Sequence, residues 1–405
     1  MRFWIKFSLF NIIIVALYGT LMRYKIGFAF PFFEQKNLLE AHSHFAFTGW
    51  ISQTLMVLMV MSIQRFLDER AIKIYKAIFI ANLVCAYCML ISFTFTGYGV
   101  ISIAFSSLSI LISYYFSWHF IKHLRTTAKS SASKNWYIAA LTFNILSSFG
   151  TYALVYMMVT KSMPELGYLG SIYFFLHFQY NGWFLFGCFG LLWDKLCELV
   201  PEMQSNKSVF WMFFLACLPA YFLSTLWMNF PPWLYWIIVL SAIVQVIAWG
   251  KLLLLIRQHI KVIKNSLEVF SKYIFLFVAI TCSIKFLLQL FSTIPVISKL
   301  AFGFRPIVIA YLHLVLLAVI SVFILAWLFS FNFIKTNKLS KTALLIFIGG
   351  VFLNEFALMI QGVASFSYFP VPHINEALFI IAVVMLLGAV LLFVSQMKHM
   401  PEKSA

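Results

Sequence analysis

Long apolar stretches recur along the whole sequence, and each is about as long as a membrane is thick. Of the 405 residues, 63% are hydrophobic and only 10% are charged. A helix of about 20 apolar residues spans the ~30 Å hydrocarbon core of a bilayer. Because lipid offers no hydrogen-bond partners to the backbone, and because these stretches are continuous rather than alternating, they must be helices. The sequence therefore predicts an all-α, polytopic membrane protein.

Twelve membrane spans are predicted, within a single transmembrane domain that covers residues 1–405. The third and fourth are joined only by Gly97-Tyr98-Gly99, which predicts a tight hairpin. The predicted spans are 3–22, 42–64, 74–96, 99–121, 136–160, 168–193, 209–228, 233–256, 272–294, 305–332, 342–361 and 374–396.

The basic residues predict the orientation of these spans. The formal net charge is +17, and 22 of the 29 Lys and Arg residues fall at the termini or in the loops after even-numbered spans. Cytoplasmic loops of membrane proteins are enriched in Lys and Arg, so both termini are expected in the cytoplasm of a bacterium, with the spans in its inner membrane. Because the basic residues lie in short loops, this bias accounts for the positive net charge without nucleic-acid binding.

Six Lys and Arg residues fall in the loops after odd-numbered spans. They are Arg23, Lys25, Lys36, Lys161, Lys299 and Arg305.

A short histidine motif recurs along the chain. Residues 44–50 read HFAFTGW, residues 177–183 read HFQYNGW, and residues 313–319, HLVLLAV, keep the histidine. The three copies lie in spans 2, 6 and 10. This spacing predicts three pseudo-equivalent arcs of four helices, at approximately 1–130, 131–265 and 266–405.

The three motif histidines are expected at one level of the membrane. At 1.5 Å per helical residue, each lies roughly 25–33 Å from the cytoplasmic end of its span. Ionisable side chains inside a bilayer are costly and usually face the bundle interior, and imidazole is a common ligand of heme iron and copper. Three histidines at equal depth favour ligation over hydrogen bonds across helices. Gly49 and Gly182 would let a helix or a flat cofactor approach.

In its twelve predicted spans and its recurring histidine motif, the chain resembles the catalytic subunit of the heme-copper oxidase superfamily, which includes the nitric oxide reductases. That family has twelve spans in three arcs, with ligands in spans 2, 6, 7 and 10. The resemblance implies that His44, with His42 as the alternative, is an axial heme ligand. It also implies that His177 binds copper or non-heme iron and that His313 binds heme.

The family pattern is incomplete in this sequence. Asn181-Gly182 stands where nitric oxide reductases have Glu-Gly, and residues 209–228 contain no histidine where the family has two. One imidazole is not a credible copper or iron site. The chain also resembles the NnrS family of heme-binding membrane proteins, which are likewise not complete oxidases. An incomplete binuclear centre is therefore expected, and whether the chain is an oxidoreductase stays open.

Two heme geometries fit the sequence. His44 and His313 could clamp one heme, or His313 could hold a heme that faces His177 across an open gas site. Arg305, eight residues before His313, could pair with heme propionates or anchor the helix at the interface. A separate soluble electron-donor protein or quinol and a small gaseous ligand are the expected partners, besides membrane lipids.

Two further charges lie at mid-depth in predicted spans. Lys285 is in span 9 and Glu355 in span 11. A buried ion pair or two steps of a proton path would explain both. The competing functions are a secondary transporter of twelve spans without heme, and an assembly protein without a cofactor. Transporters of this size are usually built from two six-span halves, whereas the period here is four spans.

Overall fold

The computed structural model describes residues 2–162, 164–228, 230–366 and 369–397, and all regular structure in these ranges is helical. The prediction of an all-α protein is confirmed. The chain divides into two compact units. Unit 1 comprises Met1–Met61, Lys73–Ile112 and Ser321–Ala405, and unit 2 comprises Ser62–Ile72 and Ser113–Ile320. Unit 1 thus joins the beginning of the chain to its end.

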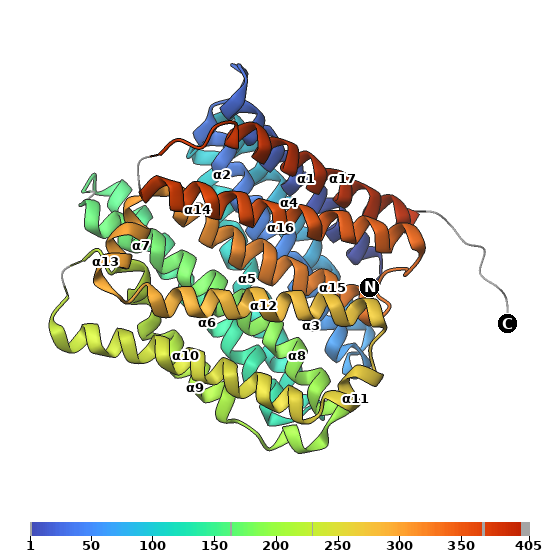
Figure 1. Cartoon of the computed structure of the whole chain (residues 1–405). Coiled ribbons are helices and arrows are strands. Elements are labelled where there is room, and N and C mark those ends of the chain that lie inside the picture. Colours follow the sequence, from blue (N-terminus) through green and yellow to red (C-terminus); the bar gives the residue numbers. More distant parts are fainter. Residues whose placement is uncertain (1, 163, 229, 367–368, 398–405) are drawn as a thin grey trace. The chain divides into compact units, whose positions relative to one another are not determined.

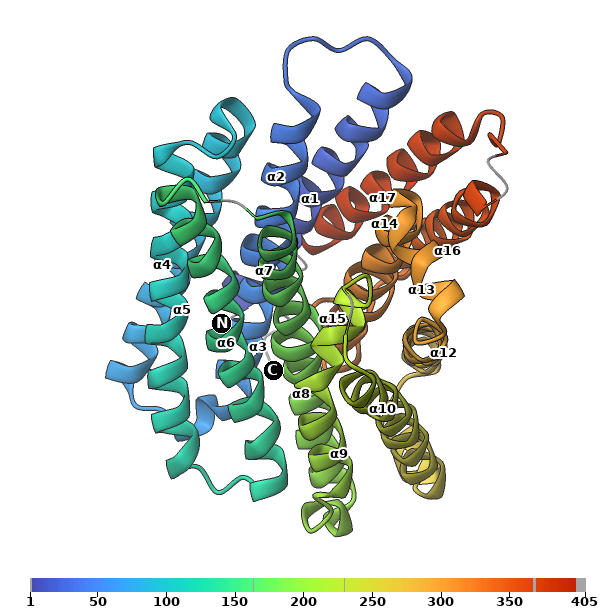
Figure 2. The same cartoon turned by 90° about the vertical axis from the view of Figure 1, so that its left-hand side faces the viewer.

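Unit 1 is a bundle of long helices. In Figures 1 and 2, α16 and α17 run side by side, and α17 also packs against α1. The helices that lie mainly in unit 1 are α1 (Arg2–Gly27), α2 (Gln35–Phe45), η1 (Ala46–Ser52), α3 (Gln53–Ile63), α4 (Glu69–Thr96), α15 (Val322–Ser330), α16 (Lys338–Phe366) and α17 (Ile374–Met397). Helix α5 (Val100–Thr126) begins in unit 1 and ends in unit 2.

Unit 2 is built around α6, which packs along the continuous helical run of α7, η3 and α8. Figure 2 shows these helices beside one another. The elements of unit 2 are η2 (Gln64–Phe66), α6 (Ser131–Val159), α7 (Glu165–His177), η3 (Phe178–Phe184), α8 (Leu185–Leu199), η4 (Pro201–Gln204), α9 (Ser208–Cys217), η5 (Pro219–Thr225), α10 (Pro232–Gln258), α11 (Ile260–Asn265), α12 (Val269–Phe291), α13 (Pro295–Gly303), α14 (Arg305–His313) and η6 (Leu314–Ser321).

Ten helices in the described residues are long and apolar enough to cross a membrane, and the bent pair α9 and η5 would make an eleventh. A polytopic membrane protein is therefore supported. The ten correspond to all the predicted spans except the sixth and the seventh. The predicted sixth span is an unbroken helical run, Glu165–Leu199, but its centre carries the polar residues His177, Gln179 and Asn181, which lower its hydropathy.

The predicted seventh span is not one straight helix. Its two parts, α9 and η5, meet at an angle of 44°. Pro219 stands at the first position after the break, and a proline has no N–H for the helical hydrogen bond to the carbonyl four residues earlier. The bend therefore follows from the sequence, and it leaves backbone carbonyls in need of partners.

The predicted hairpin between spans 3 and 4 is confirmed. Helix α4 ends at Thr96 and α5 begins at Val100. Gly97 has φ +57°, a left-handed conformation that costs a residue with a side chain more than glycine. A Cβ at this position would also lie 2.6 Å from Asn37 Oδ1, so the turn requires glycine for both reasons.

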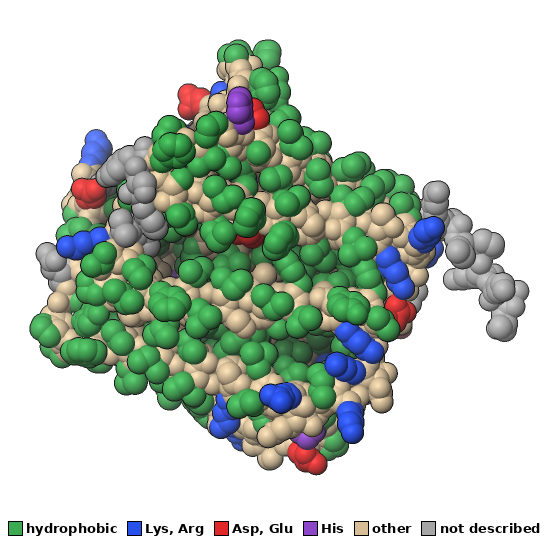
Figure 3. All heavy atoms as spheres, in the orientation of Figure 1, with side chains coloured by type: hydrophobic (Ala, Val, Ile, Leu, Met, Phe, Trp, Pro, Cys, Tyr) green, Lys and Arg blue, Asp and Glu red, His purple; other side chains and the backbone are tan. Residues whose placement is uncertain are grey.

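Exposed hydrophobic side chains cover the length of α16 and α17. Figure 3 shows many of them along these helices, with Lys and Arg side chains at the end where α16 begins and α17 ends. A surface of this kind is unfavourable in water and favourable in lipid. Lipid is therefore the expected surrounding of this face.

Candidate functional site

Each of the three motif histidines comes just before a π-helical segment. The π-helix η1 begins two residues after His44, η3 begins directly after His177, and η6 begins directly after His313. π-helical turns are rare and often occur at functional sites, because the extra residue per turn shifts side chains and disturbs the backbone ladder. The recurrence that the sequence shows as a motif is thus also a recurrence of local backbone structure.

In η1, side chains of neighbouring helices compensate for the disturbed ladder. Asn82 Nδ2 on α4 donates to the carbonyl of Thr48 at 3.1 Å, and Asn11 Nδ2 on α1 donates to the carbonyl of Gly49 at 2.5 Å. Asn82 is itself held by Gln53 Oε1 at 2.8 Å. Backbone groups in lipid must find partners inside the protein, and here two asparagines from other helices provide them.

The other two π-helical segments show the same feature at matching positions. In η3 the carbonyl of Asn181, which matches Thr48, lies 3.9 Å from Cys217 Sγ. In η6 the carbonyl of Ala318, which matches Gly49, accepts from Thr281 Oγ1 at 3.4 Å. In each motif copy, a side chain from another helix therefore contacts a carbonyl at one of these two positions.

The motif glycines make room for aromatic side chains. A Cβ at Gly182 would lie 2.5 Å from the Cβ of Phe143 on α6, so this glycine permits close helix packing, one of the two predicted uses. A Cβ at Gly49 would lie 2.8 Å from the ring of Phe45 on its own helical run.

His177 is fully buried and both of its ring nitrogens are hydrogen-bonded. Nε2 lies 2.9 Å from the carbonyl oxygen of Cys217, and because a carbonyl only accepts, Nε2 carries the proton. Nδ1 therefore accepts, and Asn181 Nδ2 donates to it at 3.2 Å. A metal would have to replace one of these bonds. The contacts favour the alternative that the sequence left open, a hydrogen bond across helices.

The helix break at Pro219 explains why the Cys217 carbonyl is available. In an unbroken α-helix this carbonyl would accept from the N–H of Tyr221, but that N–H donates to Leu218 instead, at 3.3 Å. The carbonyl of Ala216, one residue earlier, accepts from Gln245 Nε2 at 3.4 Å. Side chains from two other helices, His177 and Gln245, thus reach backbone carbonyls next to the break.

His313 has a different hydrogen-bond arrangement from His177. Its Nδ1 lies 2.9 Å from the carbonyl oxygen of Ile309 on the preceding turn, so the ring carries its proton on Nδ1 and its lone pair on Nε2. Tyr311, two residues earlier, contacts Tyr180 of η3 with ring centroids 6.3 Å apart. The segments that carry His177 and His313 are therefore neighbours within unit 2.

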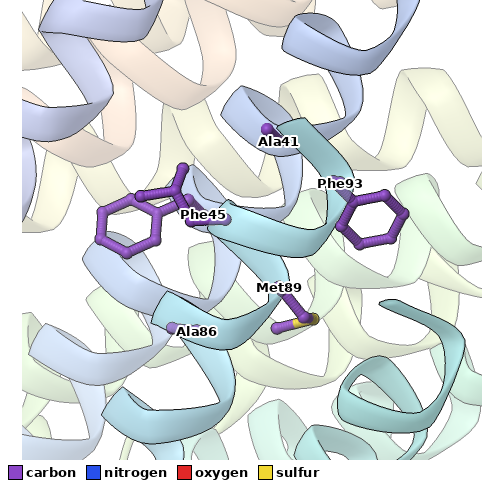
Figure 4. Close-up of a cluster of buried hydrophobic side chains, with 6 residues drawn as sticks. Ala41, Phe45, Ala86, Met89 and Phe93 are labelled. Carbon is purple, nitrogen blue, oxygen red and sulfur yellow. The ribbon is translucent and has the colours of Figure 1, made fainter. Parts of the chain in front are cut away.

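His44 lies in unit 1 on a small network at the start of its span. Nε2 is 3.3 Å from Tyr98 Oη, and that hydroxyl donates to Glu40 Oε2 at 3.1 Å. Since the Tyr98 proton points to Glu40, His44 donates from Nε2. Its ring stacks on Phe93 of α4, with centroids 4.3 Å apart. Phe93 belongs to the apolar cluster that α4 forms with Ala41 and Phe45 of α2 (Figure 4).

His42, the alternative ligand, faces α1. A Cβ at Gly19 would lie 3.4 Å from His42 Cε1, so the absence of a side chain at Gly19 makes room for this imidazole. His42 and His44 are both partly buried. The predicted clamp of one heme by His44 and His313 stays a prediction, since the two residues belong to different units.

Lys285 is completely buried in α12 and has no carboxylate within ion-pair distance among the described residues. Its Nζ donates to Gln289 Oε1 at 2.7 Å and lies 4.0 Å from the centroid of the Phe286 ring, a cation–π contact. The buried lysine is therefore stabilised by an amide and a ring.

Two other predicted residues are placed as follows. Glu355 is in α16 of unit 1, where Asn354 Nδ2 donates to its Oε1 at 3.2 Å, so its predicted pairing with Lys285 of unit 2 stays a prediction. Arg305 begins α14 and its side chain is exposed. Within the described parts of the chain, no three His, Cys, Asp or Glu side chains are grouped to hold a metal ion.

Several residues at these sites were not singled out from the sequence. Pro219 in the middle of an apolar stretch was a signal for the helix break, and Asn11 and Asn82 inside predicted spans were signals of buried amides. Tyr98 and Cys217 carried no such signal, because their partners come from distant parts of the chain.

No family model matches the sequence, and no curated protein is significantly similar to it. The functional assignment consequently depends on the residues and contacts described above.

Proposed function

We propose that this chain is a heme-binding integral membrane protein that resembles the catalytic subunit of heme-copper oxidases and nitric oxide reductases. In this proposal twelve spans form three arcs in a bacterial inner membrane, with both termini in the cytoplasm. The protein handles nitric oxide or oxygen, or transfers electrons from a donor protein or quinol. The observation that carries the proposal is the threefold recurrence of a histidine followed by a π-helical segment.

His313 would hold the heme in unit 2. Its Nδ1 donates to the Ile309 carbonyl, and metal-ligating histidines usually have their other ring nitrogen held by such a bond, which fixes the orientation of the ring. When bound, heme iron supplies electron transfer or binding of a small gaseous ligand. In unit 1, His44 or His42 would hold a heme, and the stacking of His44 on Phe93 fixes its ring plane.

Copper or non-heme iron does not fit at His177. Both ring nitrogens are used in hydrogen bonds, and no second and third ligand converge on the residue in the described part of unit 2. We therefore assign His177 the role of holding the broken helix against η3. Reduction of a gas at two metals is not part of the proposal.

A pyridine hemochrome spectrum of the purified protein tests the proposal. We expect heme in the wild type and a clearly lower ratio of heme to protein in His313→Ala. His259→Ala is the matched control, because His259 lies between α10 and α11 near Glu202 and should not affect heme content. A wild type without heme, after expression with added heme precursor, would refute the proposal.

A secondary transporter is the second candidate, and the broken helix favours it. Transporters often place binding sites at helix breaks inside the membrane, where backbone carbonyls are exposed. The break at Pro219 has this form, with the Ala216 and Cys217 carbonyls bound by side chains. Two results together would favour this candidate. The purified protein would contain no heme, and the Pro219→Ala variant would lose solute uptake in proteoliposomes.

A further inference from the structure

A groove opens at one end of unit 1, and three segments that are far apart in the sequence form it. They are the start of α1, the connection from α15 to α16, and the end of α17. The groove has a volume of about 690 Å³. We call it the Lys6 groove. Its lining residues include Ile5, Lys6, Phe333, Ile334, Lys335, Lys338 and Leu339.

The polar part of the Lys6 groove is strongly basic. Lys6, Lys335 and Lys338 all line it with exposed side chains, and no Asp or Glu is among its lining residues. Lys6 and Lys338 make no ion pair within the described residues. Three cations around one cavity attract an anionic group.

The rest of the groove is apolar and lies at the end of hydrophobic helices. Its surface is mainly apolar, and Ile5, Phe333, Ile334 and Leu339 contribute to it. The helices that lead away from it, α16 and α17, carry the hydrophobic surface that is visible in Figure 3. A ligand here would thus meet cations at the membrane border and apolar side chains next to them, which matches the two parts of a phospholipid.

We propose that the Lys6 groove binds an anionic phospholipid, with the phosphate headgroup among the three lysines and the start of an acyl chain against the apolar lining. Basic pockets between membrane helices recognise anionic headgroups in this way. The predicted orientation places the site in the cytoplasmic leaflet. The proposal is independent of heme binding, because no residue of the groove belongs to a histidine motif.

The test measures binding of phosphatidylglycerol and phosphatidylcholine to the purified full-length protein by native mass spectrometry. Each lysine near an anionic surface contributes about fivefold to affinity, so the variant K6Q/K335Q/K338Q should bind phosphatidylglycerol roughly 100-fold more weakly. The control K251Q/K261Q/K264Q removes the same charge from α10 and α11 and should bind like the wild type. Phosphatidylcholine should bind weakly to all three proteins.

Equal losses in both variants would overturn the proposal, since the effect would then be one of total charge. Equal binding of the two lipids by the wild type would also overturn it, since the groove would then not select an anionic headgroup. Displacement of the lipid by millimolar inorganic phosphate would show that the groove selects a free anion. If the groove variant does not fold, photo-crosslinking of an anionic lipid to the wild type decides. We expect label in residues 332–339, and label elsewhere only would refute the site.

Discussion

Replacing His177 by leucine removes both hydrogen bonds of the ring while a side chain of comparable bulk remains. The bonds join Nε2 to the Cys217 carbonyl at 2.9 Å and Asn181 Nδ2 to Nδ1 at 3.2 Å. Because the side chain is 0% exposed, water cannot take over either bond. The His177→Leu variant should therefore be less stable than the wild type.

The expected loss in the free energy of unfolding of His177→Leu lies between two limits. Interhelical hydrogen bonds in membranes contribute about 0.6 kcal/mol on average, so two contribute about 1.2 kcal/mol. A buried group that loses its only partner costs about 1–3 kcal/mol, so two such groups cost at most about 6 kcal/mol. The Cys217 carbonyl cannot return to a helical bond, because the Tyr221 N–H is already used. We expect a loss of about 2–4 kcal/mol in the free energy of unfolding.

Asn181→Leu provides the matched control. This change removes the bond to His177 Nδ1, but it also removes Asn181 Oδ1, a buried oxygen that has no hydrogen-bond partner within the described parts of the chain. The gain from losing that oxygen offsets part of the loss, so the variant should cost less than about 1 kcal/mol. The hydrogen-bond account thus predicts an asymmetry between the two variants.

Reversible unfolding in mixed detergent micelles, followed by tryptophan fluorescence, measures both free energies. Bound copper and iron are measured on the same samples. The reasoning is wrong if His177→Leu is as stable as the wild type, or if Asn181→Leu costs as much as His177→Leu. Loss of a metal without loss of stability would restore His177 as a ligand.

Two further predictions concern the other sites. If His42 is the heme ligand of unit 1, Gly19→Leu should shift or abolish the heme absorption bands, because the new side chain would collide with the imidazole; if His44 is the ligand, Tyr98→Phe should shift them instead. Absorption spectra of both variants decide, and no change in either would exclude both ligands. Lys285→Met should raise the free energy of unfolding by about 1 kcal/mol or more, since a buried charge without a carboxylate partner is replaced by an apolar chain of similar length. A lower free energy of unfolding in that variant would show that the amide and ring contacts outweigh the cost of burying the charge.

Much of the fold follows from local sequence. The apolar stretches predict the helices because lipid leaves the backbone no other way to satisfy its hydrogen bonds, and ten of them are present as expected. The turn at Gly97 is also local, since one residue sets the backbone conformation there. The histidine motif marks the three places where the backbone becomes π-helical, although the motif itself did not predict that geometry.

The hydrogen-bond partners and the grouping of charges are decided only by the tertiary structure. Asn11 and Asn82 reach one π-helical segment from two other helices. The Cys217 carbonyl meets His177 only because Pro219, 42 positions after His177, breaks a separate helix. The Lys6 groove likewise joins the beginning of the chain to residues more than 300 positions away. Hydropathy depends on each residue and its near neighbours, whereas these contacts depend on which helix faces which, and the sequence pattern of a single helix does not contain that information.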